Sequence, residues 1–575
     1  MTYLAKRILF AAFAVVFSTA LLHADSGDPS VRVARLHAVQ GNVSIQPSDE
    51  QQWTQAANNY PISTGDRIYS DQNSRAEIQM GNLVARVWQT TDLTMTNLAD
   101  QLTQMGLAQG SLRVHTFSLN PGEQVEVDTP NGTLMVTQPG DFRVDSYTGD
   151  GGTIVTVNSG QLEVTGPGVS QYVGAGQSVQ LTGTNPIQLV SQQMPGLDAF
   201  DRWSIDRDHH ILNARSVQYV GRGVVGYDDL DDYGSWADTS EYGPVWYPAS
   251  VAVDWVPYRY GHWVWIGPWG WTWVEEEPWG YAPFHYGRWA LIGSRWGWVP
   301  GPVVAVPVWA PAFVVFAGGD GFGAGISAWF PLGPGEPFYP WYHCSPAYIR
   351  NINITNINIT RIRNVTVVNN YNYFINHVNN VNNVHINYAN RERAFTAVNS
   401  SAFASARPVH ENLVHVDPQQ INRAQVIPHP MVSPTLEAKV PHPVRAVAVP
   451  VARPMVQVHA RTAVPVQNPV QTPAPHPQPV APVARGPQRP LTTTNQPPRP
   501  VEPRSLIGRT PPPPQGPSFE QRQQAMQAHP GRPLEPQQIE NLRQGRPAGQ
   551  MQDREWPPHP QPMARPEARP QPPRR

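Results

Sequence analysis

The sequence predicts a mainly β protein with two folded β domains and a long Pro-rich C-terminal tail. Three observations predict this class. Short alternating runs of apolar and polar residues, separated by Gly, Asn and Asp turns, fill residues 31–190. Fifteen of the 19 Trp residues lie between Trp236 and Trp341, interleaved with Gly, Pro and Tyr. Finally, 39 of the 63 Pro residues follow residue 407, which excludes most of that stretch from a packed core.

Residues 1–24 have the pattern of an export signal. Lys6 and Arg7 precede a short apolar run, and small residues follow it, with cleavage expected after Ala20 or Ala24. The run is shorter than the roughly 20 residues of a membrane span, and an uncleaved anchor is the alternative. We therefore expect a periplasmic or secreted protein with no integral membrane segment after signal cleavage.

Charge divides the chain into two parts. Residues 1–407 hold 22 Lys and Arg against 33 Asp and Glu, whereas residues 408–575 hold 19 against 10. The tail's Arg residues are spread among Pro and Gln rather than clustered, which favours a solvated, disordered tail over one that binds an anionic polymer. No nucleic acid is expected as a partner and no cofactor is indicated. The single Cys excludes a disulfide scaffold and Cys-based metal sites.

The first folded domain is expected at residues 31–190, as strands with few helices. Examples are residues 36–39, 76–80 and 154–157, each followed by a Gly or Asn turn. Turn signals recur about every 8–15 residues, a spacing typical of an all-β domain.

Ordered landmarks in this domain resemble a FecR-type domain over residues 33–185. The landmarks are residues 64–67, 74–78, 109–114, 128–131, 141–144, 159–164 and 174–178. The resemblance implies an all-β periplasmic sensing module, either a sandwich or a β-helix-like fold. Regulators of this family also carry a cytoplasmic domain that binds a sigma factor. Only five residues precede Lys6, so we expect the extracytoplasmic β-module alone to carry over.

The second domain, expected at residues 198–345, contains a partial internal repeat. Tyr260-Gly261-His262-Trp263 recurs as Tyr286-Gly287-Arg288-Trp289, and Trp269-Gly270-Trp271 recurs as Trp296-Gly297-Trp298. A looser copy is Tyr233-Gly234-Ser235-Trp236. This spacing predicts repeated β-hairpins whose rings pack on one another. The region resembles the Trp-rich domain of unknown function that follows FecR-type domains in bacterial envelope proteins, and that resemblance implies no activity.

The Trp residues are the best candidates for ligand binding. Alternate strand residues project to one face, so a platform for stacking on sugars would consist of Trp263, Trp265, Trp269, Trp271 and Trp273. The alternative is that these rings form the core of a domain that is poor in aliphatic residues.

Residues 350–390 form an Asn/Ile-rich tract, in which apolar and amide residues alternate. This pattern predicts a β tract with stacked Asn side chains, with disorder as the alternative.

The remaining clusters give little support for catalysis or a metal site. Asp228, Asp229, Asp231 and Asp232 place four carboxylates close together, a weak calcium candidate that lacks the spacing of a known loop, and the alternative is a solvated turn. Asp208-His209-His210 lacks further metal ligands, and His343-Cys344 lacks a partner for nucleophilic catalysis. The Gly-rich residues 318–325 are expected to form a turn between strands.

These observations favour a non-enzymatic, exported envelope protein that acts as a scaffold or ligand sensor. The expected partners are envelope proteins or cell-wall glycan. The alternative function is a glycan-binding module for peptidoglycan or exopolysaccharide through the Trp platform. A hydrolase that uses the acids of residues 228–232 is a third hypothesis, which the absence of a paired catalytic motif disfavours.

Overall fold

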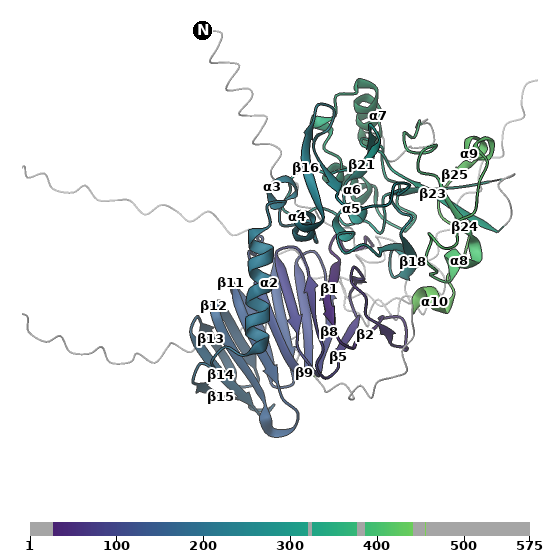
Figure 1. The fold of residues 1–575 in the computed structure, drawn as a ribbon. Coiled ribbons are helices and arrows are strands. Elements are labelled where there is room, and N and C mark those ends of the chain that lie inside the picture. The colour runs from purple at the N-terminus through teal and green to yellow at the C-terminus, as the bar shows by residue number, and fades with distance from the viewer. Residues whose placement is uncertain (1–26, 320–324, 377–385, 441–454, 456–575) are drawn as a thin grey trace, which may run out of the picture. The chain divides into compact units, whose positions relative to one another are not determined.

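The computed structural model describes residues 27–319, 325–376, 386–440 and 455, all within one compact unit, Met1–Gln467. The described chain is mainly β, as the sequence predicts (Figure 1). The expected signal peptide, the end of the Asn/Ile-rich tract at residues 377–385 and most of the Pro-rich tail lie outside the described residues. In the part that is described, no helix is both long and apolar enough to cross a bilayer.

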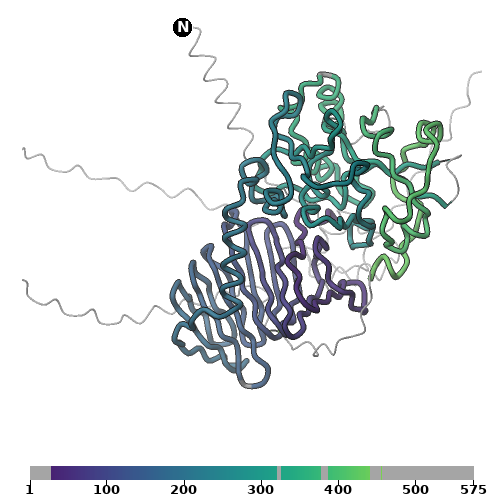
Figure 2. The backbone as a smooth tube through the Cα atoms, in the orientation of Figure 1, coloured from purple at the N-terminus to yellow at the C-terminus, as the bar shows by residue number. Residues whose placement is uncertain are grey.

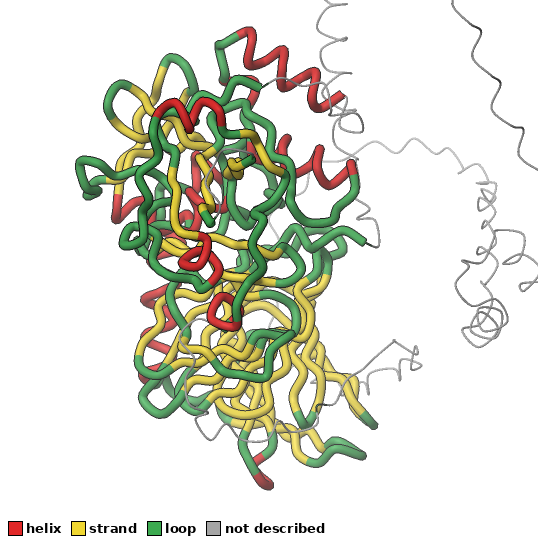
Figure 3. Tube along the Cα trace, turned by 90° about the vertical axis from the view of Figure 1, so that its right-hand side faces the viewer, coloured by secondary structure: helices red, strands yellow, loops and turns green. Residues whose placement is uncertain are grey.

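The N-terminal module contains strands β1 to β15, which hydrogen bond into one continuous sheet. Its main path runs β15-β14-β12-β11-β10-β9-β7-β6-β1-β4. The strands are β1 (Ala34–Gln40), β2 (Val43–Gln46), β3 (Thr54–Gln55), β4 (Pro61–Ile62), β5 (Arg67–Ser70), β6 (Arg75–Gln79), β7 (Leu83–Val87), β8 (Thr91–Leu98), β9 (Leu102–Thr116), β10 (Gln124–Thr129), β11 (Gly132–Ser146), β12 (Thr153–Gly166), β13 (Val169–Gly174), β14 (Gln177–Thr182) and β15 (Gln188–Gln192). Within this module the described residues form one short 3-10 helix, η1 (Gly149–Gly151), so the expected scarcity of helices is confirmed (Figure 3).

Strand alternation separates an apolar face from a charged face in the centre of this sheet. Leu112 and Val114 of β9 are buried in the core, opposite Val144 and Phe142 of β11. The intervening Arg113 therefore projects to the other face. Gly110 lets β9 pass close to β8, because a Cβ there would lie 2.4 Å from the Thr91 Cα and the backbone has a φ of +93°.

Helix α2 (Ala199–Asn213) follows the sheet and lies across its strands (Figure 1). A capping box starts the helix: the Asp198 side chain accepts from the Asp201 backbone N–H at 2.9 Å, and Asp201 accepts from the Asp198 N–H at 3.1 Å. The sequence analysis did not predict this helix. Short helical turns follow it: α3 (Val217–Val220), η2 (Tyr227–Asp229) and α4 (Leu230–Tyr233).

Three β-hairpins follow one another over residues 234–299 of the Trp-rich module, which confirms the predicted repeat of hairpins. They are β16 (Gly234–Thr239) with β17 (Gly243–Pro248), β18 (Gly261–Ile266) with β19 (Gly270–Glu275), and β20 (Arg288–Ile292) with β21 (Arg295–Val299). A short helix, α5 (Tyr281–His285), lies between the second and third hairpins. Each hairpin places Trp opposite Trp across its strands, in the pairs Trp236 and Trp246, Trp263 and Trp273, Trp265 and Trp271, and Trp289 and Trp298.

The Gly of each Tyr-Gly-x-Trp motif is required by the ring that packs against it. A Cβ on Gly261 would lie 2.7 Å from the Trp273 ring and 2.3 Å from the Val274 carbonyl oxygen. The same close approach recurs in the other hairpins, between Gly234 and Trp246 and between Gly287 and Trp298. The repeated motif therefore encodes a backbone that contacts an indole face.

A separate four-stranded sheet joins the Trp-rich region to residues that were assigned to the tail. Its order is β24 (Thr396–Asn399), β23 (Ile326–Pro331), β22 (Val314–Gly318) and β25 (Gln425–Ile427). β22 pairs antiparallel with β23. Residues 320–324 of the expected Gly-rich turn between these strands lie outside the described residues.

The expectation that disorder begins at residue 408 is wrong for residues 408–440. The chain there pairs β25 with β22 and adds α9 (Pro418–Arg423) and α10 (Leu436–Lys439), after α8 (Ser400–Ala404) (Figure 1). Figure 2 draws this segment in the green part of the colour range. Val409, Ala438 and Val440 are buried. This first part of the tail has apolar residues that are buried in the core. The boundary at residue 408 was placed too early because the Pro content was taken over the whole tail.

The expectation of a β tract at residues 350–390 is also wrong where the chain is described. Residues 350–376 lie in α6 (Pro346–Asn356), η3 (Ile359–Arg361) and α7 (Val365–Asn376). Ser345 caps α6 by accepting from the Tyr348 N–H at 3.1 Å, and Tyr348 and Ile352 share its buried face. The Asn356 amide donates to the Val308 carbonyl at 2.7 Å instead of joining a ladder of Asn side chains. Capping and an apolar i, i+4 pair therefore outweigh the alternating pattern.

Candidate functional site

Three Arg side chains form a row across neighbouring strands on the charged face of the sheet. Arg86 of β7 lies opposite Arg113 of β9, which lies opposite Arg143 of β11. Like charges directly opposite each other destabilise a sheet unless counter-charges neutralise them. We call Arg86, Arg113 and Arg143 the arginine row.

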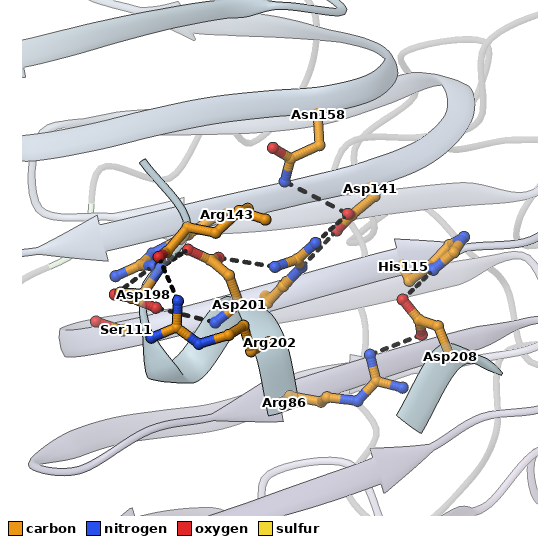
Figure 4. Close-up of polar contacts among 12 residues, drawn as sticks. Arg86, Ser111, His115, Asp141, Arg143, Asn158, Asp198, Asp201, Arg202 and Asp208 are labelled. Atoms are coloured by element: carbon orange, nitrogen blue, oxygen red, sulfur yellow. Dashed lines mark hydrogen bonds and ion pairs between the residues drawn. The ribbon is translucent and has the colours of Figure 1, made fainter. Parts of the chain in front are cut away.

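Helix α2 supplies the counter-charges. The Asp208 carboxylate lies 2.7 Å from Arg86, and Asp201 lies 2.7 Å from Arg113. Asp201 also contacts Arg143 at 2.9 Å. Figure 4 shows these side chains of α2 pointing at the arginines of the sheet. Asp201 and Asp208 are seven residues apart, two helical turns, which places them on one face of the helix.

Acidic residues of the sheet complete the neutralisation. Arg113 Nε donates to Asp141 at 2.8 Å, and Arg143 Nε donates to Asp145 at 2.9 Å. Arg86 Nε donates to Glu77 of β6 at 2.7 Å. The contacts between the arginine row, its sheet acids and α2 form what we call the ionic seam. Its members are Glu77, Arg86, Arg113, His115, Asp141, Arg143, Asp145, Asp198, Asp201, Arg207 and Asp208.

The seam continues into the Trp-rich module through a buried junction. Arg207 of α2 lies 2.8 Å from Glu77 and 3.7 Å from Asp228. Arg35 of β1, whose side chain is 0% exposed, lies 2.5 Å from Asp229. Because Asp228 and Asp229 lie shortly before β16, the first hairpin strand of the Trp-rich module, these contacts connect the two modules through charge.

Arg35 is saturated with partners at this junction. It donates to Asn59 Oδ1 at 3.0 and 2.6 Å, to Gln79 Oε1 at 3.1 Å and to the Pro278 carbonyl at 2.9 Å. With Asp229, these groups leave the planar guanidinium little freedom, so Arg35 fixes the position of residue 278 relative to β1.

The guanidinium groups decide which acids of the seam are ionised. Burial alone would raise the pKa of Glu77, but the charges of Arg86 and Arg207 lower it well below its usual range. Burial likewise opposes ionisation of Asp208, yet its hydrogen bond from His115 and the nearby Arg86 lower its pKa. Both carboxylates therefore remain charged.

The junction acids have the opposite tendency. Burial raises the pKa of Asp228 and of Asp229, and for Asp228 the neighbouring carboxylate raises it further. Burial and the charge of Arg35 lower the pKa of His37 to about 3, so its imidazole is neutral.

The four acids of the weak calcium candidate do not converge. Asp228 and Asp229 are buried at the junction, whereas Asp231 accepts from the Ser216 hydroxyl at 2.5 Å and Asp232 is exposed. Ligand atoms of His37, Asp228 and Asp229 do lie within 4.8 Å of one another. However, the guanidinium groups facing Asp228 and Asp229 already supply positive charge, which does not favour a cation there.

The candidate Trp platform is largely a core. Trp263, Trp269, Trp271 and Trp273 are each at most 2% exposed, and Trp265 is half-buried. The Trp263 ring packs against the rings of Trp273 and Trp329 at centroid distances of 5.4 Å. Other aromatic rings therefore cover the surfaces that a sugar would need.

The minor candidates also have structural contacts. Burial raises the pKa of the Cys344 thiol to about 12, the opposite of an activated nucleophile. His209 is exposed, while Asp208 belongs to the seam.

Asp201 and Arg207 were not singled out from the sequence, and Asp208 was considered only as part of the Asp208-His209-His210 cluster. The available signals were the Asp198 and Asp201 capping box and the single Arg in each of three otherwise alternating strands. Which strands are neighbours was not readable from the sequence, and therefore the arginine row was missed.

Residues 227–336 match the model of a Family of unknown function (DUF6600), which agrees with the expected Trp-rich domain of unknown function but covers less than half of the chain. No curated protein matches. A solved structure described as "a putative anti-sigma factor from Parabacteroides distasonis ATCC 8503" at 1.65 Å is 16% identical, with a TM-score of 0.20. A second structure of that description, at 2.50 Å, is 17% identical with the same TM-score. Each comparison covers 22% of this chain and 59% of the other, and similarity this low carries no argument.

Proposed function

We propose that the chain is a non-enzymatic protein of the bacterial cell envelope, periplasmic or secreted, whose two β-modules act together as a scaffold or ligand sensor. The observation that carries the proposal is the ionic seam with its junction, which links the sheet, α2 and the Trp-rich module through buried charges. A displacement of one module would separate charges from their partners, at a cost of about 3–5 kcal/mol for each broken pair. Two modules joined in this way move as one body.

The FecR-type assignment of the first module is part of this proposal. Three of its landmarks, residues 64–67, 128–131 and 174–178, include turns between strands, whereas residues 109–114, 141–144 and 159–164 lie within β9, β11 and β12. Gly65, with a φ of +90°, precedes β5, and the following Asp66 accepts from the Ser63 and Ser48 N–H groups. Gly176, with a φ of +79°, lies in the turn between β13 and β14. These contacts support a module built around the same turns.

The environment of the acids favours a structural role over hydrolysis. Asp229 is paired with Arg35, and Asp231 accepts hydrogen bonds from the Arg215 N–H and the Ser216 hydroxyl. Glycan binding through the Trp platform gains no support either, because the rings of Trp263, Trp269, Trp271 and Trp273 are buried.

The test is crosslinking of the full-length protein in intact cells of its own bacterium. We expect envelope proteins to be recovered with it, and many of them to be lost when residues 441–575 are removed, since this deletion spares the packed residues up to 440. Cell fractionation should place the protein outside the cytoplasm.

Two results would contradict the proposal. One is recovery of no envelope partner from intact cells, and the other is retention of the protein in the cytoplasm. A shift of Trp fluorescence with cell-wall fractions, abolished by Trp265→Ala, would favour the glycan-binding alternative instead, because Trp265 is the half-buried ring of the five.

A further inference from the structure

A recess of about 320 Å³ lies where the end of β9 meets the end of α2. This volume is at the lower end of the range for small-molecule sites, about 300–1,000 Å³. The recess is lined by His115, Thr116, Phe117, Pro139, Gly140, Ser159, Leu212 and Arg222. None of these side chains is acidic, and Arg222 carries a positive charge.

Arg222 is distinguished by the partner that it lacks. Its Nη1 donates to the Tyr227 hydroxyl at 3.0 Å, and its Cζ lies 5.7 Å from the centroid of the Phe117 ring. Across the described ranges, no carboxylate lies within ion-pair distance of this half-buried guanidinium. By contrast, four arginines at the contact between α2 and the sheet each contact a carboxylate, namely Arg86, Arg113, Arg143 and Arg207. The exposed Arg202 of α2 donates to the Leu197 carbonyl instead.

The acids nearest to the recess are already engaged in the ionic seam. Asp208 contacts both Arg86 and the Nδ1 atom of His115, each at 2.7 Å. Asp141 is paired with Arg113. The charge of Arg222 is therefore left uncompensated at the recess, and an anionic ligand would neutralise it.

The wall beside Arg222 combines an aromatic ring with a second nitrogen donor or acceptor. The His115 and Phe117 rings lie 4.3 Å apart between centroids. Because Asp208 engages Nδ1 of His115, the second ring nitrogen lies on the side away from that carboxylate (Figure 4). Phe117 offers an apolar surface to the body of a ligand whose charged group pairs with Arg222.

We propose that this recess binds a small molecule through a carboxylate group, with the guanidinium of Arg222 as its main partner. A planar guanidinium matches a carboxylate with two parallel hydrogen bonds. The carboxylate can belong to a uronic acid sugar or to the C-terminus of a short peptide. The inference goes beyond the proposed scaffold role and does not depend on it, because binding is measured on the isolated protein and not through cellular partners.

The experiment is ligand-observed saturation-transfer NMR on the full-length protein. The probes are glucuronate and the dipeptide N-acetyl-D-alanyl-D-alanine, with glucose and the amide of the same dipeptide as neutral controls. We expect one of the two acids to bind with a dissociation constant in the millimolar range or below, and its neutral control to give no signal. The acid that binds identifies the source of the carboxylate.

Variants then test the role of Arg222. Arg222→Gln should weaken binding at least about tenfold, since a hydrogen-bonded charge contributes about 1.5–3 kcal/mol. Arg222→Lys keeps the charge without the fork and should fall between the two. The control Arg202→Gln removes an exposed Arg of α2, which donates to the Leu197 carbonyl, and should bind like the unaltered protein.

Three outcomes would overturn the proposal. These are no binding of either acid, equal binding of an acid and its neutral control, and unchanged affinity in Arg222→Gln. If Arg222→Gln fails to fold, the comparison of acids with neutral controls and the Arg222→Lys variant still decide the question.

Discussion

Replacement of Arg35 by Met tests whether buried charge couples the two modules. The side chain is 0% exposed and lies 2.5 Å from Asp229. Without it, Asp229 loses its ion-pair partner inside the protein, and Asn59 and the Pro278 carbonyl lose a donor. Removal of one partner of a buried pair costs about 3–5 kcal/mol. We therefore expect the free energy of unfolding to fall by about that amount.

The assay is urea unfolding of the full-length protein, followed by two probes. Trp fluorescence reports mainly on the Trp-rich module, which holds most of the Trp residues, and far-UV circular dichroism reports on both modules. In the unaltered protein the two curves should coincide over the folded unit. In Arg35→Met we expect them to separate, because the coupling across the junction is weakened.

Two further variants make this test decisive. Arg35→Met combined with Asp229→Leu removes both charges, so it should be more stable than Arg35→Met alone. Arg202→Met changes an exposed Arg and should leave the curves in place. The reasoning about buried charge is refuted if Arg35→Met and Arg202→Met unfold at the same urea concentration. It is also refuted if the double variant loses as much free energy of unfolding as Arg35→Met and Asp229→Leu lose separately, added together.

Three other predictions concern the hairpins, the tail and one buried acid. Gly261→Ala should lower the free energy of unfolding by about 1–3 kcal/mol in urea unfolding, because its Cβ would overlap the opposite strand. The control Gly267→Ala should have little effect, since no atom lies within 4 Å of its Cβ. Equal effects of the two substitutions would contradict the interpretation of the repeat. A chain ending at Val440 should be as thermally stable as the full protein. A chain ending at Arg407 loses the strand that pairs with β22, so it should elute as aggregate on size-exclusion chromatography. Equal behaviour of the two chains would contradict a folded segment at residues 408–440. Burial raises the pKa of Glu336 to about 7 from 4.5, so its contribution to stability is fully present below pH 4.5 and is lost as pH rises through about 7. Glu336→Gln should flatten this fall in a series of urea titrations from pH 4.5 to 8, and an unchanged slope would contradict the assignment.

The β class and the hairpin repeat were readable from the sequence because each depends on local pattern. Strand alternation and turn residues act within a few positions. In each copy of the Tyr-Gly-x-Trp motif, such as the copy that contains Gly261, the Gly makes the same contact with a Trp ring. The Trp core was also readable as an alternative to a ligand platform. The two alternatives differ in whether the rings are buried, and burial depends on contacts between residues far apart in the chain, such as Trp263 and Trp329.

The errors have a common physical cause. Residues 350–376 alternate like a strand, but Ser345 caps a helix there and the Asn side chains find backbone partners elsewhere in the fold. Residues 408–440 have the Pro content of a disordered tail, but the exposed edge of β22 offers them a strand to pair with. In both cases a tertiary partner overrides the local preference, and that partner is not encoded in the segment itself.

The order of charges along the ionic seam explains how α2 finds one register on the sheet. A slip of α2 by one turn moves each side chain by about 5.4 Å, close to the strand spacing of about 4.8 Å. Each Asp of the helix would then meet the arginine of the neighbouring strand, so the arginine row alone does not fix the register. The next residue in the same cross-strand row is Glu77, opposite Arg86, and its helix partner is Arg207 rather than an acid.

A slipped helix would therefore place Asp208 against Glu77, or Arg207 against Arg86, with like charges buried together. Each such contact buries charges without a partner of opposite sign. The free energy lost is therefore larger than it would be if apolar side chains formed the contact between α2 and the sheet. The reversal of sign at Glu77 thus fixes the register of α2. Because Arg207 also faces Asp228, the same reversal sets where the Trp-rich module begins relative to the sheet.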